Sequence, residues 1–309
     1  MDNFEFKGVF PILVTPFAAD ESLDLESLKR VVRFMVDAGM DGVTVLGVLG
    51  EVNRLTDSDK ERVIAAAVEA AAGRIPVIVG TSHSGTRACR ELSQKAADLG
   101  AGGVMIAPSR EPTPSEQKVF EFYKSIADGT DVPIVVQDHP ASTQTFMSVS
   151  LLLRLVDEIP QVRCIKEEHP PTPQKLAALI DGMTGRRVTL LQGLGALYGL
   201  FDLERGADGF MTGFAFPEVL SAMVDATQQQ RPEYGRSLYE RFLPLIVFEQ
   251  QPGLAIRKEI YRLRGLITSN QVRHPGGSID RATAGQLRQL IDHVLPDVDL
   301  SQPLSSNAL

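Results

Sequence analysis

The sequence contains few cysteines, and they do not form a cluster. Cys89 and Cys164 are the only two, and they fall in unrelated segments without CxxC spacing. This pattern argues against a disulfide framework and against a cysteine-based zinc site. It is typical of a protein from a reducing compartment, so we expect a cytoplasmic location.

The chain also lacks an excess of basic residues and any long apolar run. Its 31 basic and 39 acidic residues give a formal charge of −8 spread along the chain, which leaves no electrostatic footprint for DNA or RNA. No apolar run approaches the ~18 residues of a membrane span. The start MDNFEFKGVF carries acidic residues where a signal peptide needs basic ones. We therefore expect a soluble protein with neither nucleic acid nor membrane as a partner.

What the sequence does contain is a regular alternation of short apolar runs with longer segments whose apolar residues recur at helical spacing. The short runs are continuously apolar, which is typical of parallel strands buried on both faces. The expected strands are 8–14, 42–47, 76–80, 102–107, 133–137, 162–166, 188–192 and 208–212. The expected helices among them are 24–38, 57–72, 86–99, 115–128, 148–157, 173–182, 195–204 and 216–229.

The eight strand–helix units fall within residues 8–229 of the chain. Eight such units in about 200–250 residues are typical of a closed (β/α)8 TIM barrel, so the sequence predicts that fold. An open doubly wound sheet is the alternative, since alternation alone does not distinguish closure from an open edge.

After the last expected strand the signals are helical only. Further helices are expected at 232–248, 253–264 and 281–293. This stretch is too short for a core of its own, so we expect it to pack on the barrel or on a neighbouring subunit. The predicted division is a barrel over 1–229, a C-terminal three-helix extension over 230–300, and a frayed polar tail over 301–309.

In a barrel the chemistry lies at the carboxyl ends of the strands, so the residues that end the apolar runs are the candidates. Lys166 ends the run VRCIK, at the mouth of the expected barrel. Removal from water at this place favours the neutral amine, which is the nucleophilic form. From this residue alone, the alternative is a lysine that reaches solvent or pairs with Glu167 or Glu168.

Several motifs in order carry a family resemblance. They are GVFPILVTPF with Thr15, Pro16 and Phe17, GVLGE at 47–51 followed by Leu55 and a helix from Asp57, PVIVGTSHSGT, and CIKE with Lys166. This set resembles the dihydrodipicolinate synthase and N-acetylneuraminate lyase family of class I aldolase-like barrels, over the whole chain. The resemblance implies that Lys166 forms a Schiff base with a small carbonyl substrate, and this chemistry needs no cofactor.

The reacting residues of that family are mostly replaced. Val48 and Leu49 stand where the family has two threonines that bind the keto-acid carboxylate and relay protons. Gln137 stands at the tyrosine that acts as acid and base beside the lysine.

Two further family positions differ as well. The chain has Ser109 and Arg110 near the tyrosine that reaches the neighbouring subunit's site, and Ser142 where an arginine is common. Because only the lysine of the reacting set remains, we do not expect an authentic dihydrodipicolinate synthase.

Another group must therefore move protons, since the amide of Gln137 does not exchange a proton near neutral pH. His139 has the best claim, because strand alternation places it on the same side as Gln137 and its imidazole titrates near neutrality. The other titratable neighbours are Asp138, His83, Glu51 and His169.

The expected substrate-binding residues lie in the loops that follow the strands. With Val48 and Leu49 in place, only the backbone N–H groups near Leu49 and Gly50 are left to receive a carboxylate. Arg110 is a candidate for an additional anion contact, and Gly193 for close backbone approach at the top of the barrel. The full set is Gly47, Val48, Leu49, Gly50, Arg110, Ser142 and Gly193.

Two other site types are considered. GLGALYG at 193–199 departs from G-x-G-x-x-G spacing, so dinucleotide binding is not expected. The histidines at 83, 139 and 169, with Asp138 and Glu51, could converge on a metal, although the sequence has no HxH or HExxH pair. We expect no metal.

The leading hypothesis is a Schiff-base lyase of aldolase or dehydratase type acting on a small oxo-acid or related carbonyl compound. The alternatives are a barrel that has lost catalysis and binds a small metabolite as a regulator, and a metal-dependent hydrolase. The resemblance further implies a homotetramer built as a dimer of dimers.

Overall fold

The computed structural model describes residues 4–113, 115–305 and 308–309. Its strands form one eight-stranded parallel sheet in the order β1-β8-β7-β6-β5-β4-β3-β2. The strands are β1 (Gly8–Val9), β2 (Val43–Val45), β3 (Val77–Gly80), β4 (Gly103–Ile106), β5 (Ile134–Asp138), β6 (Val162–Glu167), β7 (Thr189–Gln192) and β8 (Gly209–Phe210).

The sheet closes on itself between β1 and β2. Beyond the end of β1, Ile12 pairs with Thr44 of β2 in a parallel bridge. The N–H of Leu13 donates to the Thr44 carbonyl and the N–H of Thr44 donates to the Pro11 carbonyl, both at 2.8 Å. These contacts confirm the predicted (β/α)8 barrel over the open sheet.

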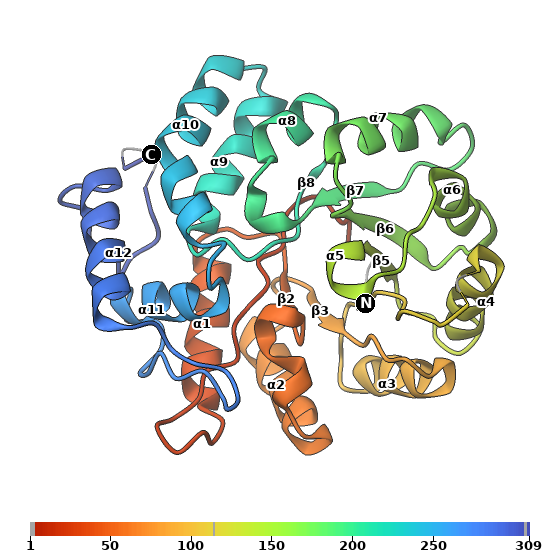
Figure 1. Cartoon of the computed structure of the whole chain (residues 1–309), viewed down its shortest axis with the longest axis horizontal. Helices are drawn as coiled ribbons and strands as arrows, with labels where there is room; N and C mark the ends of the chain where they lie inside the picture. Colours follow the sequence, from red (N-terminus) through yellow and green to blue (C-terminus); the bar gives the residue numbers. More distant parts are fainter. Residues whose placement is uncertain (1–3, 114, 306–307) are drawn as a thin grey trace.

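Helices cover the outside of the barrel, as Figure 1 shows. They are α1 (Leu25–Asp37), α2 (Asp57–Ala71), α3 (Thr86–Asp98), α4 (Glu116–Ala127), α6 (Val149–Glu158), α7 (Thr172–Gly182), α8 (Gly199–Glu204) and α9 (Pro217–Gln228). The helix expected at 195–204 is divided into the 3-10 turn η3 (Leu194–Ala196) and α8. Three short elements in the loops were not expected from the sequence, namely the 3-10 turns η1 (Val48–Gly50) and η2 (Val52–Arg54) and the one-turn helix α5 (Pro140–Thr143).

Apolar side chains fill both sides of the sheet. The larger core lies between the strands and the helices. A second cluster fills the barrel interior, where each buried side chain contributes ~1.5–3 kcal/mol of hydrophobic stabilisation. Its members are Phe6, Phe10, Ile12, Ile78, Met105, Val135, Cys164, Leu191 and Met211. Strand residues that share a face with this cluster therefore point into the barrel.

Side-chain caps fix where two of the helices begin. The hydroxyl of Thr56 accepts the N–H of Asp59 at the start of α2, and the Asp59 carboxylate accepts the N–H of Thr56 in return. Asp24 caps α1 through the N–H of Ser27 and also accepts from the Thr268 hydroxyl at 2.6 Å. A cap of this kind typically contributes ~1 kcal/mol. The second cap also ties α1 to the segment between Leu263 and Arg281 near the C-terminal end of the chain.

Three further helices lie together at one side of the barrel, α10 (Pro232–Phe248), α11 (Leu254–Leu263) and α12 (Arg281–Val294) (Figure 1). At the end of α11, Arg264 forms a buried ion pair of 2.5 Å with Glu218 of α9. Within the tail that was expected to be frayed, Leu304 is buried and its N–H donates to Glu218 at 3.2 Å, whereas Ser301, Gln302 and Ser305 are exposed. Residues 306–307 lie outside the described part of the chain.

Among the helices of the described ranges, none is both long and apolar enough to cross a membrane.

The contact of β1 with β8 leads to a stability prediction. Gly209 has φ +150°, and a Cβ atom there would lie 1.9 Å from the carbonyl oxygen of Gly8. We expect Gly209→Ala to lower the free energy of unfolding by about 2–4 kcal/mol, from backbone strain and overpacking. Gly285→Ala is the control, because Gly285 lies within α12 with nothing near its missing Cβ. The control should be neutral or slightly stabilising in urea unfolding. Equal stability of Gly209→Ala and the wild type would contradict this account of the closure.

Candidate active site

Two neighbouring strands bring the candidate lysine and glutamine together at the carboxyl end of the barrel. Gln137 of β5 pairs in register with Lys166 of β6. Alternation places Lys166 on the same face as Cys164 and Gln137 on the same face as Val135, and both of these belong to the interior cluster. Lys166 and Gln137 therefore point into the barrel.

The Lys166 ammonium is buried and has one acidic partner. Its side chain is only 3% exposed, and its Nζ lies 2.9 Å from Oε2 of Glu168. Gln137 donates through Nε2 to the same Oε2 at 2.7 Å, and the N–H of Leu194 donates to Oε1 at 3.1 Å. Both carboxylate oxygens of Glu168 thus have donors in a site closed to bulk water.

Opposing effects act on the pKa of Glu168. Burial raises the pKa of this carboxyl, but the charge of Lys166, followed by that of His139 and the hydrogen bond from Gln137, outweighs burial and holds the pKa below its usual value. In the resting site Glu168 is therefore a carboxylate, with Nζ of Lys166 2.9 Å from its Oε2. Such a pair can exchange a proton when a bound substrate changes the charges around it.

Glu168 was considered from the sequence only as a salt-bridge partner. The same alternation that suggested His139 also puts residue 168 on the side of residue 166, beyond the end of the strand. The sequence KEEHP carries this parity signal for Glu168 beside Lys166.

Gly193, after β7, leaves room for the Glu168 carboxylate. A Cβ atom at position 193 would lie 2.1 Å from Oε1 of Glu168. The absence of a side chain at Gly193 therefore allows the close approach that was expected at this position. The group that approaches Gly193 is the Glu168 carboxylate.

A cavity of about 370 Å³ opens beside Gln137 at the carboxyl ends of the strands. Residues with hydroxyl, amide and guanidinium side chains line it together with apolar residues. Its walls are formed by Leu46, Gly47, Val48, Val52, Gly80, Ser82, Met105, Ala107, Pro108, Ser109, Arg110, Gln137, Ser142, Thr143 and Gln144.

The loop after β2 contributes less to the cavity than the sequence suggested. Gly47 and Val48 line it, whereas the side chain of Leu49 packs against the interior cluster. The N–H of Gly50, expected to be available to an anion, donates to the Gly47 carbonyl at 2.9 Å within the 3-10 turn. Of the two N–H groups proposed for an anion, that of Leu49 is therefore the better placed.

Arg110 and Ser142 lie on the far side of the cavity. Arg110 is exposed, and its NH1 donates to Oε1 of Gln144 at 2.6 Å. The Ser142 hydroxyl lies 2.7 Å from Nδ1 of His139, the residue that precedes α5. His139 is thus at the start of this one-turn helix, close enough to Glu168 for its charge to affect the pKa of that carboxyl.

Asp138 and His169 belong to a separate polar cluster behind the strands. Asp138 and Glu167 are both fully buried. Lys175 of α7 forms an ion pair with Asp138, and its Nζ also lies 2.9 Å from Nδ1 of His169. Burial, and then the charge of Asp138, raises the pKa of Glu167 to about 9. Two carboxyl groups therefore share one lysine on the helix side of the sheet.

The remaining titratable candidates also lie apart. His83 is exposed and accepts the N–H of Gly85 at its Nδ1, and Glu51 is paired with Lys258. No group of three His, Cys, Asp or Glu side chains in the described ranges is arranged to hold a metal ion. The metal-dependent hydrolase hypothesis thus has no ready donor set in this part of the chain.

A larger cavity, of about 800 Å³, lies at the opposite, amino-terminal end of the barrel. Phe4, Phe6, Arg163 and Asp208 are among its lining residues. Neither Lys166 nor Glu168 lines either cavity, so volume does not identify the candidate site. The smaller cavity is the candidate because Gln137, which pairs in register with Lys166, lines it at the carboxyl ends of the strands.

Comparisons with known proteins identify the family of the chain. The sequence profile described as the Dihydrodipicolinate synthetase family matches residues 5–294. L-2-keto-3-deoxyarabonate dehydratase of Azospirillum brasilense is 38% identical over 292 residues, which cover 91% of this chain and 92% of that protein.

Solved structures are similar over nearly their whole length. Dihydrodipicolinate synthase from Rhodopseudomonas palustris has a TM-score of 0.88 at 33% identity, covering 93% of this chain and 97% of that one. A structure described as the first monomeric dihydrodipicolinate synthase variant has a TM-score of 0.88 at 26% identity, covering 95% and 98%.

An eight-stranded barrel with a lysine buried at the end of its sixth strand is the arrangement of aldolase-type lyases. The chain belongs to the dihydrodipicolinate synthetase family, as its motifs predicted, and it is an enzyme of the lyase class.

Proposed function

We propose that the protein is a Schiff-base dehydratase acting on a 2-keto-3-deoxy sugar acid, the substrate type in the name of its Azospirillum relative. The observation that carries this proposal is the buried contact of Lys166 with Glu168. The same carboxylate oxygen of Glu168 also accepts a hydrogen bond from Gln137. It supplies a nucleophilic amine and a proton acceptor in one closed site.

The proposed reaction begins with proton transfer from the Lys166 ammonium to Glu168. The neutral amine adds to the keto carbon of the substrate, and loss of water gives a protonated imine. A carboxylate then removes a proton from the adjacent carbon to form an enamine. The enamine expels the hydroxyl group from the next carbon, and this group accepts a proton and leaves as water. Water then adds to the carbon of the unsaturated imine that remains, and cleavage of its bond to Nζ releases the keto-acid product and restores the amine of Lys166. Glu168 is the group that we propose accepts and returns these protons.

The cavity suits a hydroxylated substrate. Ser82, Ser109, Ser142 and Thr143 present hydroxyl-bearing side chains among its walls. Arg110 is the cation proposed for an anionic group of the substrate, and the N–H of Leu49 is a second donor. These contacts differ from the threonine and tyrosine set of the family, so we propose that the protein is not an authentic dihydrodipicolinate synthase.

The first prediction concerns the covalent step. Borohydride reduction in the presence of a carbonyl substrate should add mass to the peptide that carries Lys166, and Lys166→Ala should abolish the adduct. A panel of 2-keto-3-deoxy sugar acids, read by turnover and by the mass of the adduct, should identify the preferred substrate. Pyruvate with aspartate semialdehyde is the comparison pair, and near-normal condensation of these two would refute the assignment as a dehydratase.

The same assay distinguishes the alternatives raised from the sequence. A regulator barrel without catalysis would give no adduct with any member of the panel. A metal-dependent hydrolase would contain stoichiometric metal by elemental analysis. An adduct on another lysine, or an unchanged one in Lys166→Ala, would overturn the role of Lys166.

The second prediction separates Glu168 from His139. Loss of a general acid–base group typically lowers the rate ~10²–10⁴-fold, so Glu168→Gln should lower kcat by this amount while the adduct remains detectable. Glu167→Gln is the matched control, because that carboxyl faces the helix side of the sheet. The role predicted for His139 from the sequence remains a hypothesis. A large loss in His139→Gln, with none in Glu168→Gln, would transfer the proton-transfer role to the histidine.

We also propose a cytoplasmic homotetramer, built as a dimer of dimers. In support, Cys89 and Cys164 are both unpaired and buried. Large apolar side chains are exposed at Phe146 (67%), Tyr198 (41%) and Phe201 (44%). Surfaces of this kind are candidates for contacts between subunits.

The assembly is testable by light scattering at micromolar concentration. A mass close to four times 33.6 kDa is the expected result. A monomer, as in the variant among the structural neighbours, would contradict the proposal.

A further inference from the structure

The loop at residues 47–51 borders the cavity and ends in a residue with an unusual backbone conformation. Glu51 has φ 56° and ψ 32°, in the left-handed region that residues other than glycine rarely adopt. Its side chain is 1% exposed and extends away from the cavity toward the C-terminal helices. A conformation of this kind persists only where other contacts hold it.

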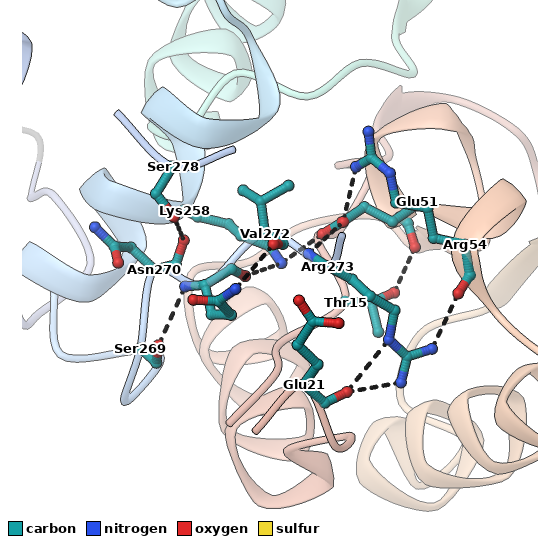
Figure 2. A network of polar contacts seen from close by, with 12 residues as sticks. Thr15, Glu21, Glu51, Arg54, Lys258, Ser269, Asn270, Val272, Arg273 and Ser278 are labelled. Carbon is teal, nitrogen blue, oxygen red and sulfur yellow. Dashed lines mark hydrogen bonds and ion pairs between the residues drawn. The ribbon is translucent and has the colours of Figure 1, made fainter. Parts of the chain in front are cut away.

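Figure 2 shows the contacts that hold Glu51. One carboxylate oxygen, Oε1, lies 2.5 Å from Nζ of Lys258. The other, Oε2, accepts from NH1 of Arg54 at 2.9 Å and from the backbone N–H of Arg273 at 3.0 Å. The donors come from helix α11, from turn η2 and from the segment between α11 and α12. One carboxylate thus joins the cavity loop to the C-terminal extension.

Lys258 is the most enclosed member of this network. Its side chain is fully buried, its Nζ donates to the Gln271 carbonyl at 2.6 Å, and it lies 4.4 Å from the centre of the Phe17 ring. Water does not compensate either charge when such a pair is broken, so removal of one partner leaves the other buried and uncompensated.

The loop has a second anchor on its barrel side. The hydroxyl of Thr15, which follows β1, donates to the Gly50 carbonyl at 2.6 Å. The hydrogen bond from Thr15 holds the 3-10 turn at Val48–Gly50 close to the end of β1. The ion pair of Glu51 holds the end of the loop against α11. Gly47 and Val48, which line the cavity, lie between β2 and these two anchors.

We propose that Lys258 is a positioning residue for substrate binding, and that it acts through Glu51 on the loop at 47–51. The inference rests on the proposed function, in which this loop contacts the substrate. It makes the C-terminal extension part of the binding machinery, although no residue of α10, α11 or α12 lines the cavity. Binding should depend on the ion pair, whereas chemistry at Lys166 should not.

The charge on Lys258 makes the arrangement sensitive to alkaline pH. Burial lowers the pKa of Lys258 to about 8, against the charge of Glu51, which raises it, while Arg54 and Arg273 lower it further. The protonated form holds Glu51, so the contact is complete well below the pKa of about 8, is half lost near it, and is lost as the pH rises further. KM should therefore increase above pH 8.

The experiment uses the full-length enzyme, with pyruvate as the probe for borohydride trapping and the preferred sugar acid for turnover. Lys258→Met should raise KM, and the pyruvate concentration for half-maximal trapping, at least tenfold. Its kcat should stay within about threefold of the wild type. Lys258→Arg should restore KM at neutral pH and move the alkaline increase of KM to higher pH, because a guanidinium stays protonated.

The buried pair of Arg264 with Glu218 provides a matched control. It ties the end of α11 to α9 and, like the first pair, spans 2.5 Å. Glu218→Gln should lower the melting temperature but leave KM unchanged. The proposal is overturned if Glu218→Gln raises KM as much as Lys258→Met does, or if Lys258→Met affects only the melting temperature.

Two measurements keep the test decisive if Lys258→Met does not fold. A wild-type KM that stays flat between pH 7 and 9 would overturn the proposal, and so would a pH profile of Lys258→Arg that coincides with that of the wild type. Absence of any adduct at Lys166 in the wild type would instead refute the proposed function. The two failures are thus distinguishable.

Discussion

The alternation of side chains along β6 divides three consecutive charged residues between two environments. Lys166 and Glu168 point into the mouth of the barrel, and Glu167 points into the layer between sheet and helices. A shift of the strand by one residue would exchange these positions and bury the wrong charge on each side. The chemistry of the site and the packing of α7 thus depend on the same two-residue period.

Several buried charges among the described residues are paired, because an isolated buried charge is costly. The pairs connect elements that are distant in sequence: Lys166 with Glu168 at the barrel mouth, Lys258 with Glu51 across the loop after β2, and Arg264 with Glu218 between α11 and α9. Each pair also restricts where its elements can move. The helical extension is consequently fastened to the barrel by specific ionic contacts as well as by apolar packing.

The fold could be predicted closely because its signals are local. Continuous apolar runs marked the strands, and apolar residues at helical spacing marked the helices. The site was predicted less completely. The contact of Lys166 with Glu168 needs only strand parity, but the 3-10 turn that occupies the N–H of Gly50 depends on contacts with Thr15 and Lys258 that come from remote segments. Short elements such as α5 carry too little periodicity to be detected from sequence.

The absence of a side chain at Gly193 restricts the order in which this site can change. The Glu168 carboxylate occupies the space that a Cβ atom at position 193 would need. Any larger residue at 193 is therefore compatible only with a shorter or displaced side chain at 168, so a step at 168 must come first or accompany it. A redesign of the pocket has to treat the two positions as one unit, since a library that varies residue 193 alone would sample mostly inactive sequences.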